Sequence, residues 1–247
     1  MRTQTHCEKF EMKEILNQEG NSNTFDLKIL KNSGKVYLMD NHMAAAWCWT
    51  QKIDFTKSYN LFHIDKHYDL LNGNLECCVK SIKNQKFNFK ESTIEEYINL
   101  KYSIPGIQRE YQVFRFDNYM TILKELYPTI FRALKFATHK DGTIPTNWDF
   151  YEPEIIDLPT SNIDYWINKE DSNWIINIDI DYFFTKNSND EYFQFLTDEY
   201  ILGFTRQLKK VWTKIEVLTI ALSPSFCGGM ENSSRIADLI IKELNIN

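Results

Sequence analysis

Four short apolar runs along the chain predict buried β-strands. They cover residues 35–39, 59–64, 173–180 and 215–222. The third run is apolar at almost every position, which is typical of a strand in a parallel sheet whose two faces are both buried. The chain therefore carries compact strands separated by much longer segments.

Four further stretches predict helices. They cover residues 92–102, 117–139, 197–212 and 232–244. Ser92 stands three residues before Glu95, which is the spacing of a capping box. Thr197 is the candidate N-cap of the third helix. Pro128 would break or kink the second helix, because proline cannot donate the helical hydrogen bond.

The alternation of strands and helices predicts an α/β fold with a mainly parallel sheet covered by helices on both faces. The segment 140–172 is rich in turn-forming residues, and no element is predicted there. The sequence contains no internal repeat and no linker-like composition. Residues 1–247 are therefore expected to form a single domain.

The composition is that of a folded, acidic protein. Its 247 residues with 43% hydrophobic content are sufficient for one large core. A net charge of −6 argues against a nucleic-acid partner, which usually meets a basic surface. No apolar run is long enough to cross a membrane, and residues 1–16 lack the apolar core of a signal peptide. With five cysteines and no CxxC pair, the simplest expectation is a reduced, cytoplasmic protein.

Acids and histidines follow three of the predicted strands. They are Asp40 and His42 after the first strand, Asp65, His67 and Asp69 after the second, and Asp179 and Asp181 at the end of the third. Alternate residues of a strand share one face, and parallel sheets bind ligands beyond the carboxyl ends of their strands. The three groups are therefore expected to meet at one edge of the sheet.

A metal centre is the simplest reason to bring these side chains together. The candidate ligands are His42, Asp65, His67, Asp69, Asp179 and Asp181. Two carboxylates near 4 Å repel by about 4 kcal/mol at an effective dielectric of about 20, and a cation removes this repulsion. Carboxylate and imidazole ligands suit Mn²⁺, Fe²⁺ or Zn²⁺, and the absence of Cys argues against a structural zinc site. Two ions with bridging carboxylates, or a solvated polar rim without metal, remain the alternatives.

Three motifs resemble the metal motifs of the arginase/deacetylase, or ureohydrolase, superfamily. They are DNH at 40–42, HIDKHYD at 63–69 and NIDIDYF at 177–183. Together with VYLMDNH at 36–42 and LTIALSPSFCGG at 218–229, the pattern is more similar to a branch that includes peptide arginases. Those enzymes convert arginine side chains to ornithine and urea during maturation of ribosomally made peptides (RiPP maturation). The resemblance spans roughly residues 35 to 243 and implies an arginase-like, three-layer αβα fold.

The resemblance also implies two Mn²⁺ ions and a role for each candidate ligand. The first ion would take His42, Asp65, Asp69 and Asp179, and the second would take Asp65, His67, Asp179 and Asp181. Asp65 and Asp179 would bridge the ions, which would activate a water for attack on the guanidinium carbon. Asp181 would accept the proton and pass it to the leaving amine.

The substrate residues are less well defined by the motifs. Arginases that act on the free amino acid hold the guanidinium with a Glu after a late strand, and this chain has Ser223 and Ser225 there, with Glu231 as the nearest acid. Asn72 stands where family members contact substrate, although a simple turn explains it equally well. No His matches the proton shuttle, for which His139 is a candidate by elimination. These departures favour an arginine-containing peptide as substrate, for which the aromatic residues of segment 144–183 could form a groove.

Other functions stay open at this point. The same site could hydrolyse another C–N bond, in an amidino compound or an acyl-lysine amide, although the adjacent His pair of the deacetylases is missing. The DxD at 179–181 also resembles the opening motif of haloacid-dehalogenase-like phosphatases, whose fold would not require His42 or the Asp65 group. A metal-binding module without catalysis is a further alternative. Metal content and urea release from an arginine peptide distinguish these possibilities.

Overall fold

A mainly parallel sheet forms the centre of the molecule. The computed structural model describes residues 12–20, 22–104 and 106–246. Within them, a seven-stranded sheet has the order β1-β2-β3-β11-β8-β4-β7. Its strands are β1 (Lys13–Asn17), β2 (Ile29–Ser33), β3 (Val36–Met39), β4 (Tyr59–Ile64), β7 (Phe131–Ala137), β8 (Trp174–Asp179) and β11 (Ile215–Ala221). The strands from β3 to β7 in this order are parallel, and β1 and β2 extend the sheet antiparallel at one edge.

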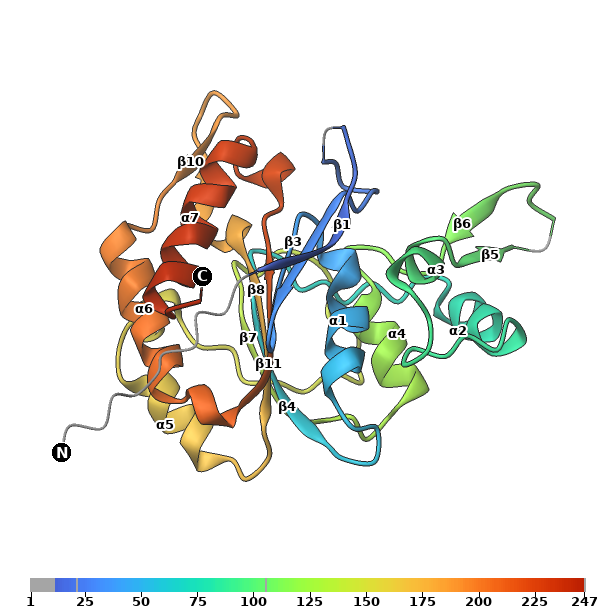
Figure 1. Ribbon diagram of the computed structural model, residues 1–247, viewed down its shortest axis with the longest axis horizontal. Coiled ribbons are helices and arrows are strands. Elements are labelled where there is room, and N and C mark those ends of the chain that lie inside the picture. The colour runs from blue at the N-terminus through green and yellow to red at the C-terminus, as the bar shows by residue number, and fades with distance from the viewer. Residues whose placement is uncertain (1–11, 21, 105, 247) are drawn as a thin grey trace.

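Helices cover both faces of this sheet, which confirms the predicted αβα layers (Figure 1). On one face lie α1 (Ala45–Lys52), α2 (Leu75–Asn84), α3 (Ile94–Ile98) and α4 (Tyr119–Leu126). On the other lie α5 (Asn162–Lys169), α6 (Asp198–Lys210) and α7 (Met230–Glu243). Two small hairpins, β5 (Lys101–Ser103) with β6 (Glu110–Gln112) and β9 (Phe184–Lys186) with β10 (Tyr192–Gln194), stand apart from the sheet. Single 3-10 turns are η1 (His42–Ala44), η2 (Ile155–Asp157), η3 (Ile180–Phe183), η4 (Trp212–Lys214) and η5 (Pro224–Phe226).

The central strands are buried because their side chains alternate between two separate cores. In β8, Ile175 packs into the core beneath α1 and α4, whereas Ile176 and Ile178 pack into the core beneath α6 and α7. Every residue of β4 and of β8 is buried. This double burial explains why the two strands could be predicted from apolar runs alone.

The predicted helix over 117–139 is correct only in its first part. Residues Tyr119–Leu126 form α4, but Phe131–Ala137 form strand β7, which pairs in parallel with β4. In the β7 sequence FRALKFA only the two Phe favour a strand, whereas Arg, Ala, Leu and Lys are good helix formers, so its local propensity does not single out a strand. Pairing with β4 overrides that propensity.

Two smaller expectations also need correction. The capping box of α3 uses Thr93 and Glu96 rather than Ser92 and Glu95: Thr93 Oγ1 accepts from the Glu96 backbone N–H, and the Glu96 carboxylate accepts from the Thr93 N–H. Segment 140–172, for which no element was predicted, contains α5. Thr197 caps α6 as expected, with its side chain accepting from Tyr200 N–H.

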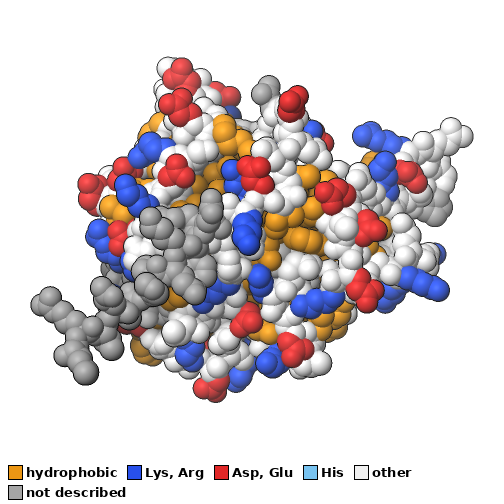
Figure 2. Space-filling model, viewed as in Figure 1, with side chains coloured by type: hydrophobic (Ala, Val, Ile, Leu, Met, Phe, Trp, Pro, Cys, Tyr) orange, Lys and Arg blue, Asp and Glu red, His pale blue; other side chains and the backbone are white. Residues whose placement is uncertain are grey.

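The lengths of the helices relate to the expectation about membranes, and the distribution of surface charge relates to the expectation about nucleic-acid partners. Across the described ranges, no helix combines the length and apolarity that a bilayer crossing requires. On the face drawn in Figure 2, basic and acidic side chains are interspersed over the described surface rather than gathered by sign. The expectation about the N-terminal sequence falls partly on residues 1–11, which lie outside the described residues.

Candidate metal centre

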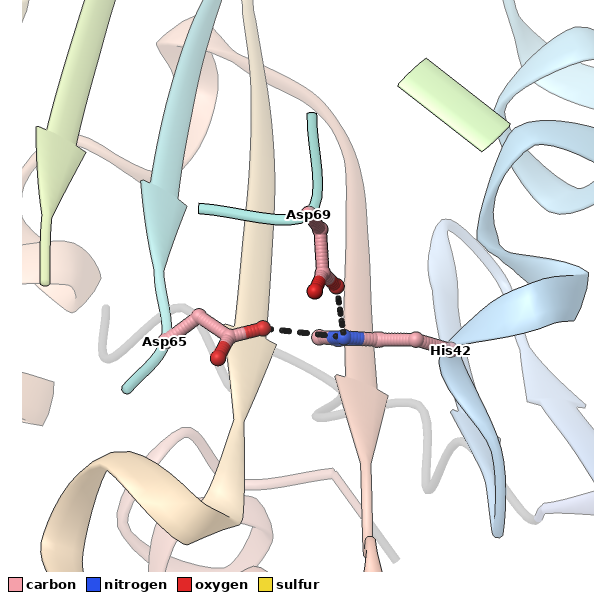
Figure 3. Close-up of side chains that lie close together, drawn as sticks. All are labelled: His42, Asp65 and Asp69. Atoms are coloured by element: carbon pink, nitrogen blue, oxygen red, sulfur yellow. Dashed lines mark hydrogen bonds and ion pairs between the residues drawn. The ribbon is translucent and has the colours of Figure 1, made fainter. Parts of the chain in front are cut away.

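His42 meets two carboxylates from a different part of the chain. It opens η1 directly after β3, whereas Asp65 and Asp69 belong to the loop that follows β4. The Nδ1 atom of His42 lies 3.1 Å from Asp65 Oδ2 and 3.3 Å from Asp69 Oδ2 (Figure 3). All three residues are buried. They form one group whose ligand atoms lie within 4.8 Å of one another.

A second group shares Asp65 with the first. His67 Nδ1 lies 3.2 Å from Asp181 Oδ2 and 3.4 Å from Asp65 Oδ1. Asp65, His67 and Asp181 also place ligand atoms within 4.8 Å of one another. Asp65 therefore faces both groups, one oxygen to each, as a bridging carboxylate would.

Asp179 lies beside both groups but is already engaged by the protein. Its Oδ2 atom is 3.2 Å from His42 Nδ1 and accepts a hydrogen bond from the Ser223 hydroxyl at 2.5 Å. Its Oδ1 atom accepts from the backbone N–H of Asp181 at 2.9 Å. The bridging role expected for Asp179 stays a prediction.

The donor set fits a hard or borderline divalent cation. Asp65 is only 1% exposed, and within the described ranges its Oδ2 atom accepts no hydrogen bond, because the nearby His42 Nδ1, 3.1 Å away, is hydrogen-bonded to Asp69 Oδ2 instead. A buried carboxylate oxygen without a donor is costly unless a positive charge compensates it. The surrounding ligands are carboxylate oxygens and imidazole nitrogens, which suit a metal of this class.

Burial and mutual repulsion change the pKa values of the carboxyl groups. Burial, followed by the charge of Asp65, raises the pKa of Asp69 to about 8. Burial and then the charge of Asp181 raise the pKa of Asp179 well above its ordinary value. Burial also acts to raise the pKa of Asp65, but contacts with His42 and His67 outweigh it and hold that pKa well below its usual range.

The pKa values of the two histidines are also raised, although burial by itself would lower them. Burial acts to lower the pKa of His67, but hydrogen bonds to Asp181 and Asp65 outweigh burial and raise the pKa to about 12. For His42, the charge of Asp179 and the contacts with Asp65 and Asp69 likewise outweigh burial and raise the pKa. A proton on either imidazole would compete with a metal cation, because neutral imidazole is the metal-binding form.

A tight loop, rather than strand alternation, brings the ligands of segment 65–69 together. β4 ends at Ile64, so the expectation that Asp65, His67 and Asp69 share a strand face is wrong. The backbone N–H of His67 donates to Asp65 Oδ1 at 2.7 Å, and Asp69 has a left-handed backbone with φ of +53°. Non-glycine residues adopt this conformation rarely, and such residues concentrate at functional sites.

These groups line an open cavity of about 270 Å³ at the carboxyl edge of the sheet. Its walls include all six predicted ligands together with Ser223 and Ser225. Asn72 lines a separate hollow beside Trp148, and Glu231 lies exposed in the first turn of α7. Neither is among the described residues of the cavity wall, so the substrate role expected for them has no support there.

Sequence reasoning missed several residues of the cavity wall. Asp141, Gly142 and Thr143 follow β7, and Phe116 and Asp117 precede α4. An acid just past a strand was the signal used for the other sites, and Asp141 would have met it had β7 been recognised.

Two other expectations about the cavity are not met. His139 Nε2 donates to the backbone oxygen of Tyr182, 3.0 Å away, and His139 lines a different hollow. The aromatic groove expected from segment 144–183 also fails: Trp148, Trp166, Tyr182 and Phe183 are buried, Tyr151 and Tyr165 are exposed, and none is among the described residues of the cavity wall. These aromatic side chains serve packing rather than the cavity.

Asp40 and Asn41 hold a second loop against the cavity. The Asp40 carboxylate accepts from the backbone N–H groups of Lys28 and Ile29 at 3.0–3.1 Å. The Asn41 amide nitrogen lies 2.9–3.2 Å from three backbone oxygens of residues 23, 24 and 26. Residues 23 and 24 line the cavity, so the first two residues of the DNH motif fix a wall while the third faces the carboxylates.

Comparison with known proteins gives structural similarity only. No protein-family model and no curated protein matches the sequence. Among solved structures, the chain is similar to a hypothetical agmatinase from Burkholderia thailandensis, with 12% identity, a TM-score of 0.47, and coverage of 85% of this chain and 57% of that one. It is also similar to the proclavaminate amidino hydrolase from Streptomyces clavuligerus, with 10% identity, a TM-score of 0.43, and coverage of 87% and 66%. An arginase from Medicago truncatula has 11% identity, a TM-score of 0.42, and coverage of 84% and 57%. The chain thus spans less than two thirds of the length of each of these proteins.

Proposed function

We propose that this protein is a dinuclear-metal hydrolase that converts arginine side chains of a peptide to ornithine with release of urea. The observation that carries the proposal is the pair of candidate ligand groups that share Asp65 at the base of an open cavity. The convergence of His42 and the 65–69 loop on Asp179 favours this reaction over the phosphatase alternative, which needs the DxD motif alone. Two ions, Mn²⁺ by the motif resemblance, would supply Lewis-acid stabilisation and water activation near neutral pH.

The charges of the cavity suit a guanidinium group. Outside the candidate ligands, Asp141 adds an exposed carboxylate to the wall, and Asp117 adds one that is paired with Arg115 at 2.8 Å. Among the described wall residues there is no Lys or Arg. A cationic side chain is therefore attracted, whereas the α-carboxylate of free arginine has no cationic partner in this part of the wall. In a peptide that carboxylate is an amide, so no such partner is required.

The mouth of the cavity also offers apolar contacts for the rest of a peptide. Leu71 and Phe116 line the cavity, and Phe25 packs edge-on against Phe116 with its ring centroid 6.4 Å away. Leu71 and Phe25 are 40% and 62% exposed. Binding energy from residues next to the arginine could be used here to position the guanidinium.

Asp181 is the residue that we propose to carry the proton in this reaction. Its Oδ1 atom accepts from the backbone N–H of Lys66 at 3.3 Å, and its Oδ2 atom faces His67 at 3.2 Å. Burial raises the pKa of Asp181, which favours proton uptake by this carboxylate. It lines the cavity, so a proton taken up here can be returned to a leaving amine held above it.

An amidino compound without a carboxylate is the second candidate substrate. The same feature of the wall favours it, because such a compound also requires no cationic partner. Agmatine, which is arginine lacking its carboxylate, is the simplest member of this class. It tests whether the peptide itself contributes to binding.

The decisive assay compares three substrates with the Mn²⁺-loaded protein. Urea should be released from a synthetic peptide that contains one arginine, together with the peptide mass change of arginine to ornithine. Free L-arginine should give much less. Asp181→Asn should reduce turnover of the peptide by at least about 100-fold if it carries the proton, and metal content measured on the same variant separates this role from its role as a ligand. Faster turnover of agmatine than of the peptide would move the assignment to the second candidate.

The alternative reactions have their own readouts in the same assay. Acetate from an acetyl-lysine peptide, or phosphate from a simple phosphate ester, would be produced in place of urea if the site were a deacetylase or a phosphatase. Either product, without urea from any guanidine compound, would show that the proposed reaction is wrong.

A further inference from the structure

A row of three polar side chains crosses the sheet directly beneath the candidate metal centre. His63 on β4, Asn177 on β8 and Thr219 on β11 pair in register across three neighbouring strands. Asn177 stands two residues before Asp179 on β8, so both side chains point to the same face, and His63 Nε2 lies 3.6 Å from Asp65 Oδ2. All three are fully buried. A buried polar row weakens a sheet unless every donor and acceptor finds a partner.

Two helical side chains supply the missing partners. Trp49 of α1 donates its indole N–H to Thr219 Oγ1 at 3.0 Å, and Thr219 Oγ1 lies 2.6 Å from Asn177 Oδ1. Asn177 Nδ2 lies 2.9 Å from His63 Nδ1 and 2.8 Å from the hydroxyl of Tyr119 on α4. These five residues, Trp49, Thr219, Asn177, His63 and Tyr119, form what we call the buried polar chain.

The backbone oxygen of His67 fixes the direction of the hydrogen bonds in the buried polar chain. A carbonyl oxygen can only accept, so His63 Nε2, 3.1 Å away, carries a proton and a neutral His63 accepts at Nδ1. The amide nitrogen of Asn177 must then face His63 and Tyr119 and donate to both. Asn177 Oδ1 therefore faces Thr219 and accepts from its hydroxyl, which itself accepts from the indole N–H of Trp49.

The two branches that leave Asn177 both reach the loop 65–69. The Nε2 atom of His63 lies 3.1 Å from the backbone oxygen of His67, to which it donates. The Tyr119 hydroxyl accepts from Asn177, so its proton is free to point at Asp69 Oδ2, 3.5 Å away. One branch thus holds the loop backbone and the other holds a candidate ligand carboxylate.

We propose that Asn177 and Tyr119 are positioning residues that orient the Asp69 carboxylate and the 65–69 loop for metal binding. The inference deepens the proposed function and rests on its metal centre. Outer hydrogen-bond partners of metal ligands set ligand orientation, and their removal typically weakens metal binding by about 10- to 100-fold. Asn177 is the junction from which both branches leave, so its loss should act on both ligand groups, whereas loss of the Tyr119 hydroxyl should act on one.

The Tyr119→Phe variant tests the branch to Asp69. Calorimetric titration with Mn²⁺ should show about tenfold weaker binding at the group that contains Asp69, with the His67 and Asp181 group unchanged. Tyr59→Phe is the matched control, because Tyr59 is also buried and its hydroxyl accepts from Asp54 N–H at the opposite end of β4. This control should titrate like the wild-type protein. Equal affinities for wild type and Tyr119→Phe would overturn the positioning role.

A second measurement determines the direction of the hydrogen bonds in the buried polar chain, and it uses the metal-free protein. In the metal-free wild-type protein, ¹⁵N NMR should find the proton of His63 on Nε2. In Asn177→Asp two acceptor oxygens replace the amide, so His63 should gain a proton on Nδ1 and keep the one that Nε2 donates to the His67 oxygen, and Mn²⁺ binding at both groups should weaken by about 10- to 100-fold. If the proton of His63 in the wild-type protein is found on Nδ1 instead, the hydrogen bonds of the buried polar chain run in the opposite direction and the proposal is overturned.

The two measurements separate this proposal from the proposed function. Tight binding of two ions by the wild type together with an unaffected Tyr119→Phe variant would refute the positioning role and leave the metal centre intact. A wild type that shows the expected His63 tautomer but binds no Mn²⁺ would refute the metal centre, and the positioning role would fall with it.

Discussion

The Nδ1 atom of His42 lies 3.1 Å from Asp65 Oδ2, although β11 and β8 separate β3 from β4 in the sheet. Neighbouring strands lie about 4.8 Å apart, so strands three places apart are separated by roughly 14 Å. The contact therefore depends on two loops that fold inward over the ends of the central strands. Those strands end at Asp179 and just before Ser223, which hydrogen-bond to each other at 2.5 Å beside His42.

Because Asp65 belongs to both ligand groups, its substitution should remove more metal than the substitution of a ligand that belongs to one group. Asp65→Asn should abolish tight binding of both ions, because Asp65 faces both groups. His67→Ala should lose one ion and keep the other, because His67 belongs to one group only. Elemental analysis after Mn²⁺ loading and desalting measures both results. Asp117→Asn is the control, since it neutralises a cavity acid that pairs with Arg115 rather than with a candidate ligand, and it should retain two ions. A full complement in Asp65→Asn would show that the ligand assignment is wrong.

The pKa shifts predict that metal-free protein loses stability as pH rises. The pKa of Asp69 is raised to about 8, against about 3.9 in an unfolded chain, so the folded state holds an extra proton between these values. The pKa of His67 is raised to about 12, against about 6.5 unfolded, with the same consequence at higher pH. Where the folded state binds more protons, the free energy of unfolding falls with rising pH.

Metal should reverse this trend, because it displaces those protons. With chelator the melting temperature should fall from about pH 6 to about pH 8.5, and the increase in melting temperature on adding Mn²⁺ should be larger at the higher pH. Calorimetry in two buffers of different ionisation enthalpy should detect proton release on binding. A melting temperature that is indifferent to chelator at both pH values would count against the whole cluster.

The loop held by Asp40 and Asn41 should matter for substrate rather than for metal. Asn41→Ala removes the amide that contacts three backbone oxygens of residues 23, 24 and 26, and should lower the free energy of unfolding by about 1–3 kcal/mol. Hydrogen exchange should accelerate in residues 22–28, and turnover of the arginine peptide should fall while two ions still bind. Asn32→Ala is the control, since Asn32 bonds two backbone oxygens at the β2–β3 turn and should leave exchange at 22–28 unchanged. If Asn41→Ala behaves like this control, the loop is held by other contacts.

The acid at the end of β7 should contribute to binding of the cationic substrate. Asp141 is exposed at the cavity wall, so Asp141→Asn should raise KM for an arginine peptide by about two- to fivefold, the effect of an exposed ion pair, with little change in kcat. The loss should shrink at high salt because the interaction is screened. Asp171→Asn, at the exposed amino-terminal end of β8, is the matched control and should leave KM unaltered. An equal effect of both substitutions would indicate a general charge effect instead of a local contact.

The candidate ligands could be predicted from the sequence because they directly follow strands whose burial is visible in the sequence itself. Asp65 and Asp179 end runs in which every residue is buried, so their positions depend on local pattern and on the general property that parallel strands share a carboxyl edge. The way the loop 65–69 gathers its ligands could not be predicted, because it depends on the left-handed backbone of Asp69.

Other parts of the site depend on contacts that no local pattern contains. Asp141 was missed because β7 is a strand only through its pairing with β4. The buried polar chain was missed because it depends on the register that sets His63, Asn177 and Thr219 side by side. Each of these three looks like a single polar interruption of an apolar strand until the strands are aligned.

Anomalous diffraction from crystals soaked in Mn²⁺ is the most direct test of the claim that Asp65 joins two metal sites. Two peaks are predicted about 3.5–4 Å apart, the usual separation in two-metal sites. One should lie among His42, Asp65 and Asp69, and the other among Asp65, His67 and Asp181. A single peak, or two peaks that do not share Asp65, would contradict the account.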